Sequence, residues 1–364
     1  MVVVAVAVMS SASRKTADNG AGVGNKVIKI GIIAPLTGNE AALGEGMKNA
    51  GEMAQDMLNA RTDASVTHGF TYQVVVEDDA FDPAKTVSAA QKLITVDHVS
   101  ALMTLASAAG NVVAPIANQD QVVHFGIASD PNIAKGPFNF LHWTPPSEET
   151  KVFVSELEKR GYHHVAVLGA NIQGIAAVAD SFEKDIQGTD IQEASRQTFN
   201  FGTTDFRTMI DKAQASHPDI YLVLSFSPET EILTKQMKDA GITTPVTSIE
   251  SFELSDHPEQ YEGDWYVNAA NRTPAFDAAY TARFGKTASL GAGNAYDIVL
   301  LVAAATEQAG AKGIPTPAEI ASALHSVTVP QGALGSLSVN AANMVDTKAV
   351  VRMIKDGKPV TVGE

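Results

Sequence analysis

Residues 99–131 constrain the fold of this chain more than any other stretch. They read VSALMTLASAAGNVVAPIANQDQVVHFGIASDP. An apolar strand is expected over 99–105, a helix over 111–119 and a second strand over 122–125, and each strand runs into a turn of small residues. This order predicts two parallel strands joined by a helix that crosses one face of a sheet. Both turns then lie at the carboxyl ends of strands, where ligands bind in open α/β folds.

The same alternation extends along most of the chain. Before this stretch, strands are expected at 26–34 and 72–76, and after it at 164–168, 195–199, 219–224 and 246–249, with helices between them. The segment 219–250 repeats the strand, turn, helix and strand order of 99–129, which indicates two similar lobes. We therefore expect an α/β protein with two doubly wound parallel-sheet lobes joined by a three-segment hinge.

The lobe boundaries follow from where the alternation stops and restarts. The prolines at 145 and 146 look like a first crossing between domains, and residues 327–331 like a later one. We expect lobe 1 to comprise 26–145 plus about 274–328. Lobe 2 is then 146–273 plus about 329–364.

Residues 1–25 form a different kind of segment. The apolar run MVVVAVAVM is too short to span a bilayer and is followed by the small residues SSAS. This order is typical of a secretory signal, although it lacks a basic n-region. We expect a signal-like segment with a disordered lead-in, and export to the periplasm. A hydrophobic tail on a cytoplasmic protein is the alternative.

Composition excludes several function classes. A net charge of −15 argues against nucleic acid and against anionic membrane surfaces. The absence of cysteine excludes disulfides, thiol catalysis and thiolate metal sites. Neither a GxSxG motif nor a phosphate-binding loop is present, so we expect a binding protein without cofactor or metal rather than an enzyme. The acidic turn Glu77–Asp79 is expected to cap local backbone rather than to hold a metal.

The turn after residue 105 predicts a site for a small anion. A helix that begins just after Ser107 points free N–H groups and the positive end of its dipole at the crevice. A serine hydroxyl beside such a terminus completes a cradle for a carboxylate. If the two lobes face each other, the turns of both sheets line one cleft, which is the geometry of a hinged clamp.

The sequence resembles the type I periplasmic binding proteins of branched-chain amino acid transport. The resemblance rests on IKIGIIAPLTG (28–38), DDAFDP (78–83), LASAAG (105–110) and IASDP (127–131), and it extends over about 26–357. It implies a solute-binding protein, expected to be a monomer, that captures a small hydrophobic amino acid between its lobes. It also implies delivery of that ligand to an ABC permease.

The same resemblance implies which residues bind the ligand. Ser107 and the backbone amides of Ala106 and Ala108 would hold the α-carboxylate. The carbonyl of Ile127 and the hydroxyl of Ser129 would receive the α-ammonium. Glu250 would supply the counter-charge, because a buried unpaired ammonium is costly to desolvate. The walls of the side-chain pocket are expected from Leu43, Leu105, Gln173 and Phe226.

Two other functions stay open. Leu43 stands where the family usually has an aromatic residue, and the loop 40–44 is similar to relatives that take aromatic acids. The chain could therefore bind aromatic or aliphatic carboxylates for the same kind of importer. It could also be a sensory ligand-binding module of the same fold.

Overall fold

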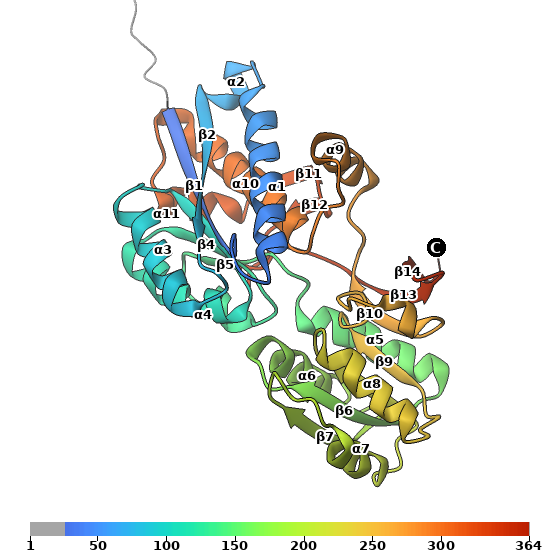
Figure 1. The fold of residues 1–364 in the computed structure, drawn as a ribbon. Coiled ribbons are helices and arrows are strands. Elements are labelled where there is room, and N and C mark those ends of the chain that lie inside the picture. Colours follow the sequence, from blue (N-terminus) through green and yellow to red (C-terminus); the bar gives the residue numbers. More distant parts are fainter. Residues whose placement is uncertain (1–25, 364) are drawn as a thin grey trace, which may run out of the picture.

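The chain folds into two lobes connected along one side (Figure 1). The computed structural model describes residues 26–363, so the signal-like segment expected at 1–25 lies outside the described residues. Within that range, no helix has both the length and the apolar character needed to cross a membrane.

The first lobe is built on a parallel sheet of order β2-β1-β3-β4-β5. Its strands are β1 (Lys26–Ala34), β2 (Phe70–Asp78), β3 (Ala101–Leu105), β4 (Val123–Ile127) and β5 (Asn139–Leu141). One face packs on α1 (Ala41–Asn59), α10 (Ala292–Ala309) and α11 (Pro317–Leu324), and the other on α3 (Pro83–Thr95) and α4 (Ser107–Asp120). The lobe also carries the short α2 (Ala64–Thr67) and α9 (Pro274–Phe284). Helices on both faces explain why these strands are almost continuous apolar runs.

The second lobe is built on a seven-stranded sheet of order β14-β13-β10-β9-β8-β6-β7. The strands are β6 (His164–Ala170), β7 (Gln192–Phe199), β8 (Ile220–Leu224), β9 (Val246–Ile249), β10 (Trp265–Ala269), β13 (Ala349–Lys355) and β14 (Lys358–Thr361). Helices α5 (Pro146–Arg160) and α6 (Gln173–Asp185) cover one face, and α7 (Arg207–Gln214) and α8 (Glu229–Asp239) cover the other. The first five strands are parallel, whereas β13 and β14 add an antiparallel hairpin at one edge. The expectation of two doubly wound lobes is confirmed.

The acidic turn after β2 ties neighbouring loops together. The carboxylate of Asp78 accepts hydrogen bonds from the Leu36 N–H at 2.8 Å and from the Thr37 hydroxyl at 2.6 Å. The Thr37 hydrogen bond is the main reason why the pKa of Asp78 is lowered to about 2. Asp82 caps α3 by accepting from the Ala84 N–H at 2.8 Å. These acids therefore fix the backbone beside the carboxyl ends of β1 and β2.

Three segments connect the lobes: β5 to α5, β10 to α9, and the chain before β13. The first is anchored by His142, whose Nε2 lies 3.1 Å from Oδ2 of Asp297 on α10, with both side chains fully buried. The same carboxylate accepts the backbone N–H groups of Ala333 and Leu334. One buried acid thus joins the first connection to the loop between β11 (Thr328–Gly332) and β12 (Gly335–Ser338).

The third crossing lies later than the expected boundary near residue 328. Leu337, Val339 and Val345 are buried in the core of the first lobe, and Leu141 forms a β-bridge with Met344. The physical reason is that these apolar side chains gain more by completing this core than they could as part of an exposed connection. The chain therefore leaves the first lobe only after Val345.

Helix α4 begins at Ser107, in line with the helix N-terminus predicted beside that serine but ahead of 111, where the helical pattern was expected to start. The small residues of the run Ser-Ala-Ala-Gly are typical of a turn. Alanine is, however, the best helix former, and Ala106 already has the non-helical backbone that ends the preceding turn.

Candidate functional site

The first-lobe turns meet at the N-terminus of α4. Ala106 has φ 72° and ψ 155°, a backbone conformation that residues other than glycine rarely adopt. Its N–H donates to the carbonyl of Ile127 at 3.0 Å, which fixes the end of β3 against the end of β4. Ser107 then opens the helix, buried to 9% exposure, and Ser129 is half-buried on the adjoining turn. The strained residue therefore lies where the sequence predicted ligand contacts.

The second lobe approaches this turn through the first residues of α6. A Cβ atom added to Gly174 would lie 3.2 Å from the Ser107 hydroxyl and 3.6 Å from the Ser129 Cβ. Beside it, Nδ2 of Asn111 donates to Oε1 of Gln173 at 2.9 Å, which is a hydrogen bond between the lobes. The N-termini of α4 and α6 thus meet at one point. Two positive dipole ends and their free N–H groups favour an anionic group between them.

Glu250 follows β9 and contacts the first connection between the lobes. Its φ of 67° is again unusual for a residue with a side chain. Its Oε1 accepts a hydrogen bond from the indole Nε1 of Trp143 at 2.6 Å, and Trp143 belongs to the first connection between the lobes. Burial is the main cause that raises the pKa of Glu250, and the Trp143 hydrogen bond opposes that rise. The half-buried side chain can be an anion held in place by its neighbours.

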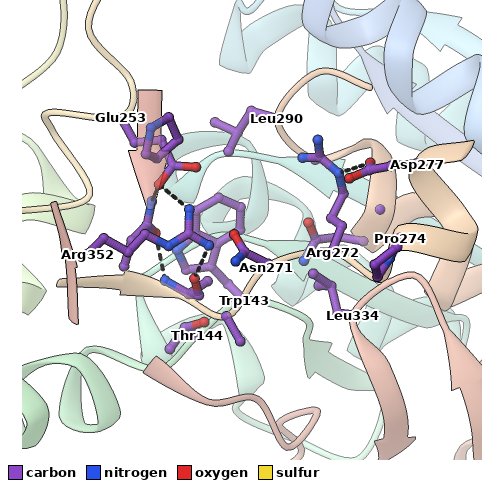
Figure 2. Close-up of a pocket in the computed structure, with 17 residues that line it drawn as sticks. Trp143, Thr144, Glu253, Asn271, Arg272, Pro274, Asp277, Leu290, Leu334 and Arg352 are labelled. Carbon is purple, nitrogen blue, oxygen red and sulfur yellow. Dashed lines mark hydrogen bonds and ion pairs between the residues drawn. The ribbon is translucent and has the colours of Figure 1, made fainter. Parts of the chain in front are cut away.

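A cavity of about 620 Å³ lies on the hinge side of Trp143, and we call it the hinge cavity (Figure 2). Both lobes and two of the connections contribute to its walls. It is lined by Trp143, Thr144, Glu253, Asn268, Ala269, Ala270, Asn271, Arg272, Pro274, Asp277, Leu290, Gly291, Gly293, Asn294, Leu334, Arg352 and Pro359.

The charges around the hinge cavity form two ion pairs. Arg352 pairs with Glu253 and also donates to the carbonyl of Ala269 at 2.8 Å. Across the cavity, Nε of Arg272 lies 2.8 Å from Asp277 (Figure 2). Because each arginine has an acid beside it, the walls carry no excess charge. A neutral or apolar group can enter the cavity without leaving a charge unpaired.

None of the ten residues that the sequence singled out lines the hinge cavity, but two border it. A Cβ atom on Gly291 would lie 3.3 Å from Cδ1 of Leu105, so Leu105 packs directly behind that wall. Glu250 reaches the cavity wall through its hydrogen bond to Trp143.

The other candidates for pocket walls lie at different places. Leu43 packs against the core of the first lobe, and Phe226 stacks on Phe201 with ring centroids 6.2 Å apart. Gln173 and Ala108 are exposed. The structure brings Ser107, Ser129 and Gln173 together, while the roles expected for all ten residues stay predictions.

Sequence reasoning missed Trp143, Gly174 as the point of lobe contact, and the buried acid Glu149 on the first turn of α5. Trp143 could have been noticed because a large aromatic residue in a Pro-rich connection has few ways to be buried. For Glu149 no local signal existed, since it reads as an ordinary acid near a helix N-terminus.

Three comparisons with known proteins place this geometry in context. The sequence profile of the family described as periplasmic binding protein matches residues 27–358. A Leu/Ile/Val-binding protein homolog from Brucella melitensis is 27% identical over 331 residues, which cover 85% of this chain and 86% of that protein.

Solved structures are similar over nearly the whole fold. The branched-chain amino acid transporter substrate-binding protein LivJ from Streptococcus pneumoniae, in complex with isoleucine, has a TM-score of 0.77 at 25% identity and covers 92% of this chain and 98% of that one. A solute-binding protein of an ABC transporter from R. palustris, in complex with benzoate, has a TM-score of 0.78 at 18% identity, covering 93% of this chain and 96% of that one.

Proposed function

Because the chain belongs to the periplasmic binding protein family, we propose that it captures a small amino acid with a hydrophobic side chain and delivers it to an ABC importer. The carrying observation is that groups favouring an anion and a group favouring a cation both lie where the two lobes or their connection come together. The helix ends at Ser107 and Gly174 favour an anion, and Glu250 favours a cation. An α-amino acid carries both charges on adjacent atoms.

The ligand's side chain extends toward the hinge cavity in this proposal. Leu290 supplies apolar surface on the first-lobe side and Leu105 packs behind the neighbouring wall at Gly291, while Trp143 lines the cavity and hydrogen-bonds Glu250. The cavity volume of about 620 Å³ is within the range of small-molecule sites in proteins. A branched aliphatic side chain would gain roughly 1.5–3 kcal/mol from full burial there.

Capture works as a clamp. The first lobe presents the anchor at Ser107 and Ser129, and closure brings α6 and Glu250 of the second lobe against the ligand. A ligand that touches both lobes stabilises the closed state over the open one, which is how binding and closure are coupled. A permease that recognises the closed conformation would then bind the protein with its ligand.

The remaining features of the proposal follow from this role. The protein acts outside the cytoplasm, as a monomer, and carries out no chemical conversion of its ligand. Its partners are the ligand and the membrane subunits of an importer.

Binding of an aromatic or aliphatic carboxylate is the second candidate. One observation favours it: the indole of Trp143 donates a hydrogen bond to Glu250, so this carboxylate has a partner other than an ammonium group. The raised pKa of Glu250 also makes it easier to neutralise by a proton than an ordinary glutamate. The anchor at Ser107 would then hold the carboxylate, with no ammonium opposite Glu250.

A ligand panel tests the proposal. Thermal shift followed by calorimetry would compare L-leucine, L-isoleucine, L-valine and L-alanine with 4-methylpentanoate and benzoate. A ligand at 100 times its dissociation constant stabilises the folded state by about 2.7 kcal/mol. Binding of leucine and its neighbours supports the proposal, whereas binding of only the two carboxylates without an amino group would replace it with the second candidate.

A further inference from the structure

Asn111 lies one helical turn after Ser107 on α4, and its side-chain amide contacts partners in both lobes. Its Nδ2 lies 2.8 Å from Oδ2 of Asp130, on the first-lobe turn that follows β4. The same nitrogen lies 2.9 Å from Oε1 of Gln173, the first residue of α6 in the second lobe. The proposed function assigns no task to Asn111 or to Asp130.

Asp130 determines which end of the Asn111 amide faces the second lobe. Its side chain is buried, and an ionised carboxylate can only accept hydrogen bonds. Asn111 therefore turns its NH2 group, rather than its carbonyl oxygen, toward Asp130. Because an NH2 group has two hydrogens, one remains for Gln173. Oδ1 of Asp130 accepts the backbone N–H of Asn132 at 2.9 Å, which holds the acid itself in place.

Gln173 receives this hydrogen bond beside the first-lobe anchor. Its side chain is exposed, and Gly174 follows it directly. A Cβ atom on Gly174 would lie 3.2 Å from the Ser107 hydroxyl, so the start of α6 already lies against the anchor. The hydrogen bond from Asn111 to Gln173 joins the two lobes away from their connections. It is made when the lobes are close together and is lost when they separate.

We infer that Asn111 is a positioning residue for ligand capture: oriented by Asp130, it donates to Gln173 and holds the second lobe closed over the anchor. The inference rests on the proposed function, and it adds how the closed state is stabilised. A hydrogen bond that is present in the closed state and absent from the open one favours closure. In this role it does not depend on the ligand's side chain, so it strengthens the binding of every accepted ligand by the same factor.

Two substitutions remove this hydrogen bond from opposite sides. Gln173→Met keeps the length of the side chain but has no oxygen to accept, and Asn111→Leu keeps much of the volume but has no donor. Each should weaken the binding of L-leucine, L-valine and L-alanine by about fivefold in calorimetry, the usual effect of losing one uncharged hydrogen bond. The double variant should lose no more affinity than Asn111→Leu alone, because both substitutions remove the same interaction.

The control is Asn171→Ala in the same loop of the second lobe. Nδ2 of Asn171 lies 3.2 Å from Oδ1 of Asn200, an exposed hydrogen bond between two amides that both belong to this lobe. Its loss should leave all three affinities unchanged. Unchanged affinities in Gln173→Met would overturn the inference. A loss that differs between leucine and alanine would also overturn it, because Gln173 would then contact the ligand's side chain.

A measurement without ligand keeps this test separate from the proposed function. The chain has no cysteine, so Asp120→Cys on α4 and Lys184→Cys on α6, both at exposed positions, give two unique sites for spin labels. Adding Gln173→Met should shift the distance between the labels toward longer values, because the open state gains population. An unchanged distance distribution would refute the inference whatever the ligand is. A wild-type protein that binds no amino acid, together with this shift in the variant, would refute the proposed function and leave the role of Asn111 in closure standing.

Discussion

Trp143 donates its indole N–H to Glu250 over 2.6 Å, although the two residues come from different parts of the fold. Trp143 lies in the first connection between the lobes, and Glu250 follows β9 in the second lobe. A residue of the hinge therefore holds the side chain of Glu250, the acid that is expected to contact the ligand. Any change in the hinge that moves Trp143 also moves the hydrogen bond that orients Glu250.

Replacing Trp143 by phenylalanine should weaken amino acid binding. The change removes the donor but keeps an aromatic ring, and a hydrogen bond to a charged group contributes about 1.5–3 kcal/mol. Calorimetry with L-leucine should therefore show a loss of about tenfold or more. The control is Trp265→Phe, since the indole N–H of Trp265 has no partner among the described residues. If the two variants bind L-leucine equally well, Trp143 does not contribute to ligand binding.

Replacing Glu250 by glutamine should weaken binding of amino acids by more than about 1.4 kcal/mol, which is tenfold. Glutamine accepts the Trp143 hydrogen bond but provides no negative charge for an ammonium group. The matched comparison is 4-methylpentanoate, which lacks the amino group of leucine and should lose little or no affinity. If calorimetry shows an unchanged affinity for leucine, Glu250 is not part of the binding site.

Adding one methyl group at Gly174 should oppose closure of the lobes. The new Cβ would lie 3.2 Å from the Ser107 hydroxyl, closer than most side chains tolerate, and such overpacking typically costs about 1–3 kcal/mol. The leucine affinity of Gly174→Ala should fall at least fivefold.

The stability of the ligand-free Gly174→Ala variant supplies its own control. Alanine is better than glycine in a helix by up to about 1 kcal/mol, so the melting temperature without ligand should not decrease. A lower melting temperature with unchanged affinity would mean that Gly174 matters for folding of α6 rather than for closure.

The sequence was sufficient for the fold because its signals are local and repeated. Most parallel strands of the two sheets are short apolar runs bounded by turn residues, and Asp82 followed by Pro83 is a typical helix start, as found for α3. The third crossing was misplaced because it depends on which core Leu337 and Val345 complete, and that is a tertiary choice.

Only part of the candidate site could be predicted from the sequence. Residues at the ends of β3, β4 and β9 could be named, because topology alone brings the carboxyl ends of parallel strands to one edge. Contacts made between the lobes by Trp143 and Gly174 have no signature in the local sequence. They depend on how the lobes are oriented, which no spacing of residues encodes.

Filling the hinge cavity at Leu290 should change which side chains are accepted. Leu290→Trp adds bulk at a wall of the cavity, so the affinity for L-leucine should fall by about tenfold while that for L-alanine changes little. The control is Ile314→Trp, because Ile314 is 60% exposed and away from the cavity wall. Equal losses for leucine and alanine would mean that ligand side chains do not reach this cavity.

The contribution of Asp264 to the stability of the protein should decrease as the pH rises through the acidic range. Burial raises its pKa to about 6, whereas an aspartate in the unfolded chain titrates near 4. Between these values the folded state binds the proton more tightly than the unfolded state, so each rise in pH favours unfolding. The contribution is fully present below pH 4 and is lost by about pH 7.

Asp264→Asn should remove this dependence, because asparagine cannot ionise. Urea unfolding at pH 4, 5.5 and 7.5 should show that the variant gains stability relative to the wild type as the pH rises. A wild-type stability advantage that grows with pH would show that ionised Asp264 has a stabilising partner, opposite to the effect of its burial.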